Sequence, residues 1–443
     1  MKLIKQLYFT NRFFQAISGV VALFMLTFFF EFLVITPKLL FFALLGLVLV
    51  DFIRLFRVKK GLKGKRITPE KLSNGDQNEL LVELVNFYTF SVQVDIIDEI
   101  PHQFQVRDHH HSLSLGSGTS EMLAYYLRPV KRGEYSFGAL NIYVSSSLGL
   151  VKRRFRFSEN KVVPVYPSYL QLRQYELLAI SNRLVDLGIK KIRKIGHNME
   201  MESIKEYVVG DDYRTINWKA SARRGDLMVN VYQDEKSQQV FSLIDKSRAM
   251  QMPFEGMSLL DYAINSSLVI WNIAFLIEVN AGLITFQQKV NTLLPASNRS
   301  VQMQLITQSL YSQKTAYKEA DFSVLYSTIK RKITQRSLLL LYTNFETLSG
   351  MQRQLPFLKN LAKSHLLVVI FFKNTELDDL LENTATKTKE IYNKAIAEKL
   401  AYEKQLIVKE LNNQGIQTIL TKPQHLTVNT INKYLELKAR GYI

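Results

Sequence analysis

A long apolar stretch near the N-terminus constrains this chain more than any other feature. Residues 13–35 carry a single charge, Glu31, and these 23 residues exceed the roughly 20 that a helix needs to span a bilayer. Residues 39–56 form a second apolar stretch, which is the weaker of the two because Asp51 lies within it. The pattern predicts two transmembrane helices joined by a tight turn, a helical hairpin within residues 1–58.

Two other structures can account for an apolar N-terminus. A cleaved signal peptide has a shorter apolar core of about 7–15 residues and a cleavage site between small residues. No such site precedes the second apolar stretch. A helical hairpin of a soluble protein usually keeps one polar face, whereas residues 24–30 are apolar all round. The membrane hairpin therefore remains the favoured interpretation.

Positive charge is concentrated at the same end of the chain. Residues 1–66 contain eleven basic and two acidic side chains, so half of the formal net charge of +18 lies in the first 66 of 443 residues. Basic residues precede the first apolar stretch and follow the second, and Lys38 alone lies between them. Because positive flanks stay in the cytoplasm, we expect both termini and the C-terminal body to be cytoplasmic.

Short alternating segments behind the hairpin indicate strands. Residues 79–85 and 91–97 alternate apolar with polar side chains, and turn residues such as 116–118 separate the segments. Short strands at this spacing predict a β-sandwich domain over residues 66–167. Further strands are predicted at 123–128, 139–144 and 161–166.

Strands alternate with helices from residue 239 to 443. Residues 240–245 are a continuous apolar run, which is typical of a strand buried on both faces. The alternation predicts an α/β domain with a parallel sheet covered by helices. Further strands are predicted at 282–287, 337–343, 365–372 and 416–420, and helices at 258–276, 301–311, 321–332 and 377–413. Residues 168–238 form a linker, with a helical pattern at 169–186 and a basic run at 190–194.

The densest mixture of charged, aromatic and turn residues lies at 207–227, inside the linker. It contains Trp218, one of only two tryptophans in the chain. We expect Trp218 to be a buried anchor that fixes this segment to the α/β domain, and Arg214 to pair with Asp211 or another acid. The candidate partner-binding residues are Gly210, Asp211, Asp212, Arg214, Trp218, Lys219 and Arg223.

This segment resembles the signature of the domain-of-unknown-function 58 family. Supporting similarity continues at 245–250 and upstream at 132–138, 148–150 and 165–167. The resemblance implies that the α/β domain is von Willebrand factor A-like. It also implies a multi-pass protein of the bacterial inner (cytoplasmic) membrane, partnered with a MoxR-type AAA+ ATPase. It indicates an architecture and a partner rather than a reaction.

The resemblance also raises the question of a magnesium site. Von Willebrand A domains often hold Mg²⁺ with Asp-x-Ser-x-Ser after the first strand, followed by a Thr and an Asp from later loops. Asp245 and Ser247 match, but Ala249 replaces the second serine. Asp321 and the pair Thr343-Asn344 stand where the later ligands are expected, and neither supplies the full pattern. We therefore expect no cofactor, with weak Mg²⁺ binding as the alternative, since Mg²⁺ needs several hard oxygen ligands.

Three consecutive histidines invite a second metal interpretation. In a strand, His109 and His111 would share one face and form a two-point site. No other histidine or carboxylate is placed beside them by the sequence, apart from Asp108. A solvated loop is therefore favoured over a metal site.

These features together favour a non-enzymatic, membrane-anchored scaffold that binds protein partners through its A-like domain. With a MoxR-type ATPase, it would help to assemble or remodel complexes. An enzyme of unknown reaction is less favoured, because the chain lacks Gly-x-Ser-x-Gly and has no cysteine. A nucleic-acid-binding or anionic-lipid-binding protein is the other alternative, resting on the runs at 190–194 and 223–224. Nucleic acid is not expected, since no recognised nucleic-acid fold accompanies those runs.

Overall fold

The structure is a computed structural model in which the chain divides into two compact units, Met1–Tyr166 and Pro167–Ile443. The structure describes residues 6–30, 34–106, 109–157, 160–171, 173, 200–208, 211, 213–233, 238–276, 279–315, 317–375, 381 and 387–442. The predicted linker helix at 169–186 and the basic run at 190–194 lie almost entirely outside these residues.

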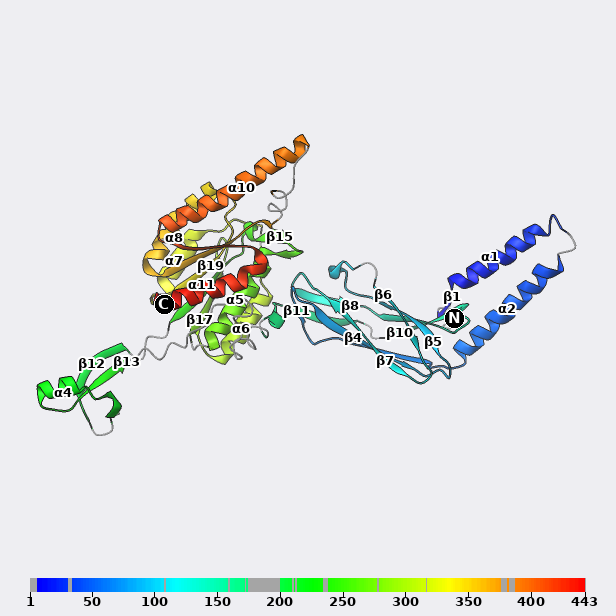
Figure 1. Cartoon of the computed structure of the whole chain (residues 1–443), viewed down its shortest axis with the longest axis horizontal. Helices are drawn as coiled ribbons and strands as arrows, with labels where there is room; N and C mark the ends of the chain where they lie inside the picture. Colours follow the sequence, from blue (N-terminus) through cyan, green and yellow to red (C-terminus); the bar gives the residue numbers. More distant parts are fainter. Residues whose placement is uncertain are drawn as a thin grey trace. The chain divides into compact units, whose positions relative to one another are not determined.

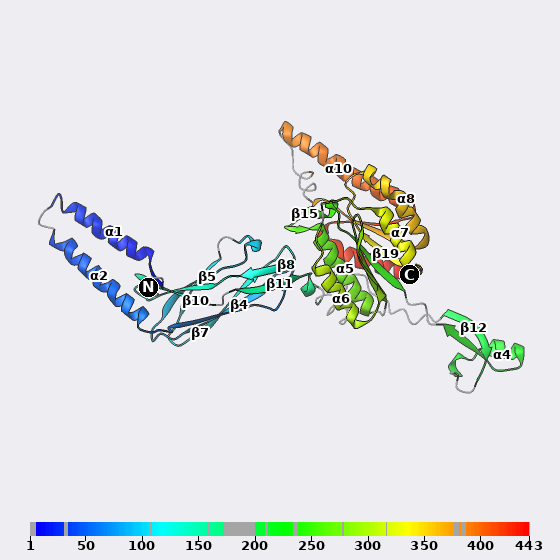
Figure 2. The ribbon, with the colours of Figure 1, turned by 180° about the vertical axis from the view of Figure 1, so that it is seen from behind.

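Two helices begin the first unit and lie side by side (Figures 1 and 2). Helix α1 spans Asn11–Leu26 and helix α2 spans Ile35–Phe56. The predicted boundaries, 13–35 and 39–56, therefore differ from the observed ones. Pro37 lies in the first turn of α2, where a missing N–H removes no helical hydrogen bond, so the proline does not separate the helices as expected.

Helix α2 exposes most of its apolar side chains. Phe42 and Leu45, for example, are 67% and 57% exposed. In the second unit, helix α5 (Leu259–Leu276) is also long and apolar enough to cross a membrane, but most of it is buried inside the protein. Helix α5 is therefore a core helix, whereas the apolar surface of α2 has no protein covering within the described part of the chain.

Polar bonds join the two helices to the first unit's sheets. Asp51, completely buried in α2, accepts hydrogen bonds from the Ser146 hydroxyl and from the backbone N–H groups of Leu150 and Val151, the last two at 3.0 Å. At the end of α2, the Arg153 guanidinium donates to three backbone carbonyls, including Leu55 O at 2.8 Å. Asp51 therefore acts as a joint between helix and sheet.

Three antiparallel or mixed sheets make up the rest of the first unit. Their strand orders are β1-β10-β9-β5-β6, β2-β4-β7 and β3-β11-β8. Their inward side chains form one hydrophobic core. The strands are β1 (Leu7–Phe9), β2 (Leu62–Ile67), β3 (Leu72–Ser73), β4 (Asn78–Asn86), β5 (Val92–Asp98), β6 (His110–Leu115), β7 (Ser120–Leu127), β8 (Gly133–Phe137), β9 (Leu140–Ser145), β10 (Val151–Phe157) and β11 (Lys161–Tyr166).

The second unit is built on a six-stranded sheet of order β18-β17-β14-β19-β20-β21. Five strands are parallel, as predicted, and β18 (Val290–Ser297) pairs antiparallel with β17 at one edge. The parallel strands are β14 (Gln239–Asp245), β17 (Asn280–Phe286), β19 (Leu338–Tyr342), β20 (Leu366–Phe372) and β21 (Gln417–Thr421).

Helices cover both faces of this sheet (Figure 1). One core joins the sheet to α5, α6 (Ser300–Tyr311) and α11 (Leu426–Ala439). The opposite core joins it to α7 (Phe322–Lys332), α8 (Leu348–Ser364) and α10 (Thr388–Asn413). This doubly wound arrangement is the predicted α/β architecture, although α8 had no counterpart among the predicted helices.

Candidate functional site

The carboxyl edge of the parallel sheet brings together the predicted metal-site residues. Asp245 ends β14 and is only 2% exposed. Its Oδ1 accepts a hydrogen bond from Ser247 N at 2.7 Å, and its Oδ2 accepts one from Thr343 Oγ1, also at 2.7 Å. Thr343 follows β19, which neighbours β14, so the topology places these distant residues at one point.

These contacts occupy both oxygens of the Asp245 carboxylate with bonds inside the protein. Burial raises the pKa of Asp245, and the hydrogen bonds from Thr343 and Ser247 oppose that rise. Asp321, the other predicted acid, instead caps helix α7: its Oδ1 accepts from Ser323 N at 2.9 Å. No group of three or more His, Asp or Glu side chains suited to a metal occurs among the described residues. Weak Mg²⁺ binding through Asp245 and Ser247 stays a prediction.

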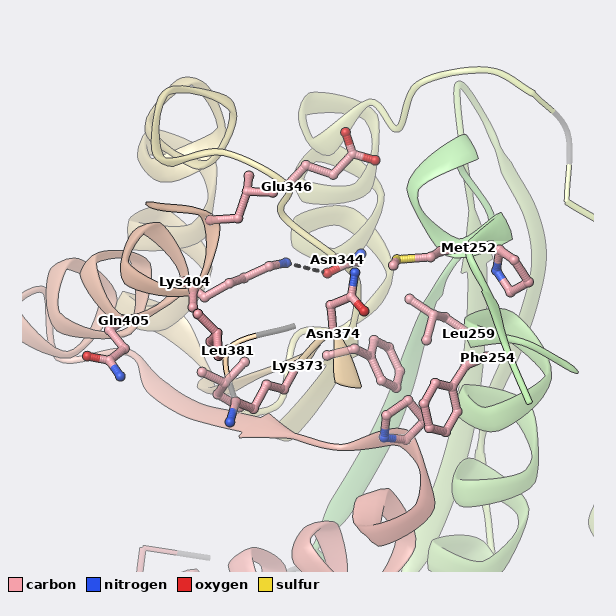
Figure 3. A pocket seen from close by; sticks show the side chains of 16 residues that line it. Met252, Phe254, Leu259, Asn344, Glu346, Lys373, Asn374, Leu381, Lys404 and Gln405 are labelled. Carbon is pink, nitrogen blue, oxygen red and sulfur yellow. Dashed lines mark hydrogen bonds between the residues drawn. The ribbon is translucent and has the colours of Figure 1, made fainter. Parts of the chain in front are cut away.

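A pocket of about 460 Å³ lies at the same edge, beside the ends of β19, β20 and β21 (Figure 3). Lys404 reaches into it from α10, and its ammonium donates hydrogen bonds to Asn344 Oδ1 at 2.7 Å and to the carbonyl of Phe345. Burial lowers the pKa of Lys404 to about 8, against a smaller opposing effect of Glu346. The rest of the lining is mainly apolar: Met252, Pro253, Phe254, Leu259, Phe372, Leu381, Leu400, Ala401, Leu420 and Pro423.

The signature segment folds as a small motif of its own. Strands β12 (Glu200–Glu206) and β13 (Met228–Gln233) pair antiparallel and enclose the short helix α4 (Trp218–Arg224). The Asn217 side chain caps the start of α4 by accepting from Ala220 N at 3.0 Å. Gly225, with φ 84°, ends the helix in the left-handed conformation that favours glycine.

The expectation for Trp218 was wrong. Its side chain is 70% exposed at the first position of helix α4, and its neighbours Lys219 and Arg223 are exposed as well. The buried tryptophan is Trp271 of α5, whose indole N–H donates to the Ser242 hydroxyl at 3.0 Å. The scarcity of tryptophan in the sequence therefore did not show which of the two is the anchor.

The expected pairing of Arg214 with Asp211 or another acid stays a prediction, and the described partners of Asp211 are Lys205 and Val208. Asp211 forms an ion pair with Lys205 at 2.9 Å and accepts from Val208 N at 3.0 Å, which lowers its pKa. Gly210 and Asp212 lie outside the described residues, as does the side chain of Arg214. The structure therefore places Asp211, Trp218, Lys219 and Arg223 of the candidate set.

The histidine run is partly a strand rather than the expected loop. Residues His110–Leu115 form β6, and the rings of His109 and His111 lie on one face with their centroids 4.8 Å apart. Burial lowers the pKa of His109, and the nearby His111 lowers it further. Both rings pack on Tyr125, whose hydroxyl donates to the buried Asp98. The pairing of these rings on one strand face follows the predicted alternation.

Comparisons with known proteins agree with the sequence resemblance. Residues 203–381 match the family described as "Protein of unknown function DUF58". The uncharacterized protein YeaD of Bacillus subtilis (strain 168) is 30% identical over 129 residues, which are 29% of this chain and 31% of that protein. The similarity thus spans less than a third of the relative's length.

Several solved structures share parts of the architecture. The conserved hypothetical protein BatB from Bacteroides thetaiotaomicron has a TM-score of 0.30 and 13% identity, covering 46% of this chain and 100% of that one. The SpRpn10 VWA domain has a TM-score of 0.28 and 10% identity. The match covers 44% of this chain and 93% of that domain. These scores are too low to assign a function. The family model matches residues 203–381, which are less than half of the chain, and this match supports the resemblance to the DUF58 family read from the sequence.

Proposed function

We propose that this chain is a membrane-anchored scaffold that binds a protein partner through helix α4. The observation that carries the proposal is the exposure of Trp218 beside Lys219 and Arg223 on a helix that is capped at both ends. Tryptophan and arginine are enriched among the residues that dominate binding energy at protein interfaces. An exposed tryptophan on an ordered helix loses little conformational entropy when it is buried by a partner.

The positive charge of α4 favours an acidic surface on the partner. Lys219 and Arg223 are joined by Arg224, which lies 3.5 Å from Glu206 in an exposed ion pair. Complementary charge speeds association and excludes partners that are positively charged. A MoxR-type AAA+ ATPase, the partner implied by the family resemblance, is our candidate. The chain would then hold that ATPase at the membrane for assembly or remodelling of complexes, without catalysing a reaction itself.

The test uses the detergent-solubilised full chain and a purified MoxR-type ATPase from the same organism, mixed with and without ATP. We expect the two proteins to co-elute and Trp218→Ala to weaken binding at least about tenfold, as for other interface hot spots. Tyr392→Ala is the matched control, since Tyr392 is a similarly exposed aromatic residue of α10. Equal binding by wild type and Trp218→Ala would contradict the role of α4, and binding of DNA alone would favour the nucleic-acid alternative.

The membrane part of the proposal rests on the exposed apolar surface of α1 and α2. We propose that these helices form a transmembrane hairpin in the bacterial inner membrane and that the sheets of residues 62–166 are the layers of a β-sandwich. Contiguous exposed apolar surface of this kind marks a membrane or protein contact. Because positively charged flanks stay in the cytoplasm, the proposal puts both termini on the cytoplasmic side. Reporter fusions at residue 443 and within residues 27–30 should report opposite sides, and an external C-terminus would contradict the scheme.

A further inference from the structure

The pocket beside α10 combines a half-buried cation with mainly apolar walls. In Figure 3, Lys404 extends from α10 toward Asn344, with Met252, Leu259 and Phe254 across the pocket. Its volume of about 460 Å³ lies within the range of about 300–1,000 Å³ that is usual for small-molecule sites. It also lies outside the carboxyl ends of parallel strands, where open α/β sheets generally bind their ligands.

Lys404 forms no ion pair with an acid among the described residues. Its two hydrogen-bond acceptors, Asn344 Oδ1 and the Phe345 carbonyl, are both neutral. No acid in the described part of the chain forms an ion pair with it, and the Glu346 carboxylate acts on it only at longer range. An ammonium carries three donor hydrogens, so one remains for a further acceptor. Partial burial of a cation whose described partners are neutral is costly, and an anionic ligand would reduce that cost.

We propose that this pocket binds a small carboxylic acid with an apolar body. The carboxylate would pair with the Lys404 ammonium, and the body would lie against Met252, Phe254 and Leu259. Ten of the sixteen lining residues are apolar, which suits an apolar body, and the Lys404 ammonium suits a carboxylate. The exposed Lys373, with Asn374 and Gln405, belongs to the polar part of the lining. This site is independent of α4 and goes beyond the scaffold function.

The protonation of Lys404 gives the site a defined pH dependence. The pKa of this lysine is lowered to about 8 by burial, so the amine is mostly charged at pH 7 and mostly neutral at pH 9. A bound carboxylate favours the charged form, so binding is strongest below pH 8 and weakens above it. Between pH 7 and pH 9 the fraction of free protein with a charged Lys404 falls about tenfold, so the affinity for the carboxylate should fall by about the same factor.

The experiment is equilibrium dialysis of the detergent-solubilised full chain against 4-phenylbutyrate at pH 7. The neutral amide 4-phenylbutanamide serves as the uncharged analogue. We expect the acid to bind, and both the amide and Lys404→Gln to show binding at least about tenfold weaker, the usual effect of losing one charged hydrogen bond. Lys399→Gln, which removes an exposed lysine of the same helix, should bind the acid like wild type.

Three results would overturn the proposal. They are equal binding of acid and amide, undiminished binding by Lys404→Gln, or no binding of the acid by wild type at millimolar concentration. If Lys404→Gln fails to fold, the pH series on wild type decides, because binding that is unchanged from pH 7 to pH 9 also refutes the role of the ammonium. Loss of the ATPase interaction with intact acid binding would refute the scaffold proposal alone.

Discussion

Replacing Asp51 tests whether the apolar helix α2 is joined to the first unit's sheets as the structure shows. The carboxylate accepts three hydrogen bonds, from Ser146 Oγ and the N–H groups of Leu150 and Val151. Asp51→Leu leaves three buried donors without an acceptor. At about 1–3 kcal/mol for each unpaired group, the free energy of unfolding should fall by about 3–9 kcal/mol. That loss is comparable with the whole stability of a typical domain.

Asp51→Asn separates the loss of charge from the loss of shape. An amide oxygen can still accept from the two backbone N–H groups, while its NH₂ donates to Ser146 Oγ. Only the charged character of the bonds is lost, so the expected cost is smaller, about 2–3 kcal/mol. The order of stability should therefore be wild type, then Asp51→Asn, then Asp51→Leu.

Hydrogen exchange followed by mass spectrometry of the detergent-solubilised full chain measures the loss of stability around the partners of Asp51. Peptides covering residues 146–157 should exchange about 30- to 150-fold faster in Asp51→Asn, since 1.4 kcal/mol corresponds to a factor of ten. Peptides of β14 in the second unit should be unchanged. Lys38→Leu makes the same charge-to-leucine change at an exposed position of α2 and serves as the control. Wild-type exchange at 146–157 in Asp51→Leu would refute the joint.

Four further outcomes follow from buried and exposed groups. Trp218→Ala should change the free energy of unfolding by no more than about 0.5 kcal/mol, because the side chain is exposed; thermal melts check this. Asp98→Ala should cost about 3–5 kcal/mol by leaving the buried Arg66 cation unpaired, and chemical denaturation measures it. Because burial raises the pKa of Asp245, wild type should lose stability as pH rises above about 4, the unfolded value, and Asp245→Asn should lack that loss in melts across pH. With 1 mM Mg²⁺ we expect almost no change in melting temperature; a clear rise abolished by Asp245→Asn would show a working metal site.

Periodicity explains why much of the fold was predictable. The alternation at 79–85 and the apolar run at 240–245 correspond to β4 and β14, since burial of one face or of both faces imposes these patterns. Strand β10 (Val151–Phe157) was not predicted. Four of its seven residues are Lys or Arg, so its sequence shows little apolar periodicity. Helix α8 contains Pro356, a residue that usually interrupts helices.

The candidate site was less accessible to sequence reasoning. Asp245 and Thr343 are 98 positions apart and meet only because β14 and β19 are neighbours in the sheet. Lys404 lies in a strongly charged helical stretch, where nothing in the local pattern distinguishes this half-buried lysine from its exposed neighbours. Contacts of this kind depend on topology, which local propensity does not encode.

The bond between Thr10 and Gly149 has a consequence for synthesis of the chain. The Thr10 hydroxyl donates to Gly149 O at 2.6 Å across 139 positions, and β1 pairs with β10 just beside it. At translation rates of about 5–20 residues per second, the N-terminal segment waits about 7–30 s for its partners to leave the ribosome. Helices α1 and α2 are therefore synthesised several seconds before the residues of the first unit that form hydrogen bonds with them. A truncated chain that stops before residue 146 would present α1 and α2 without these polar joints.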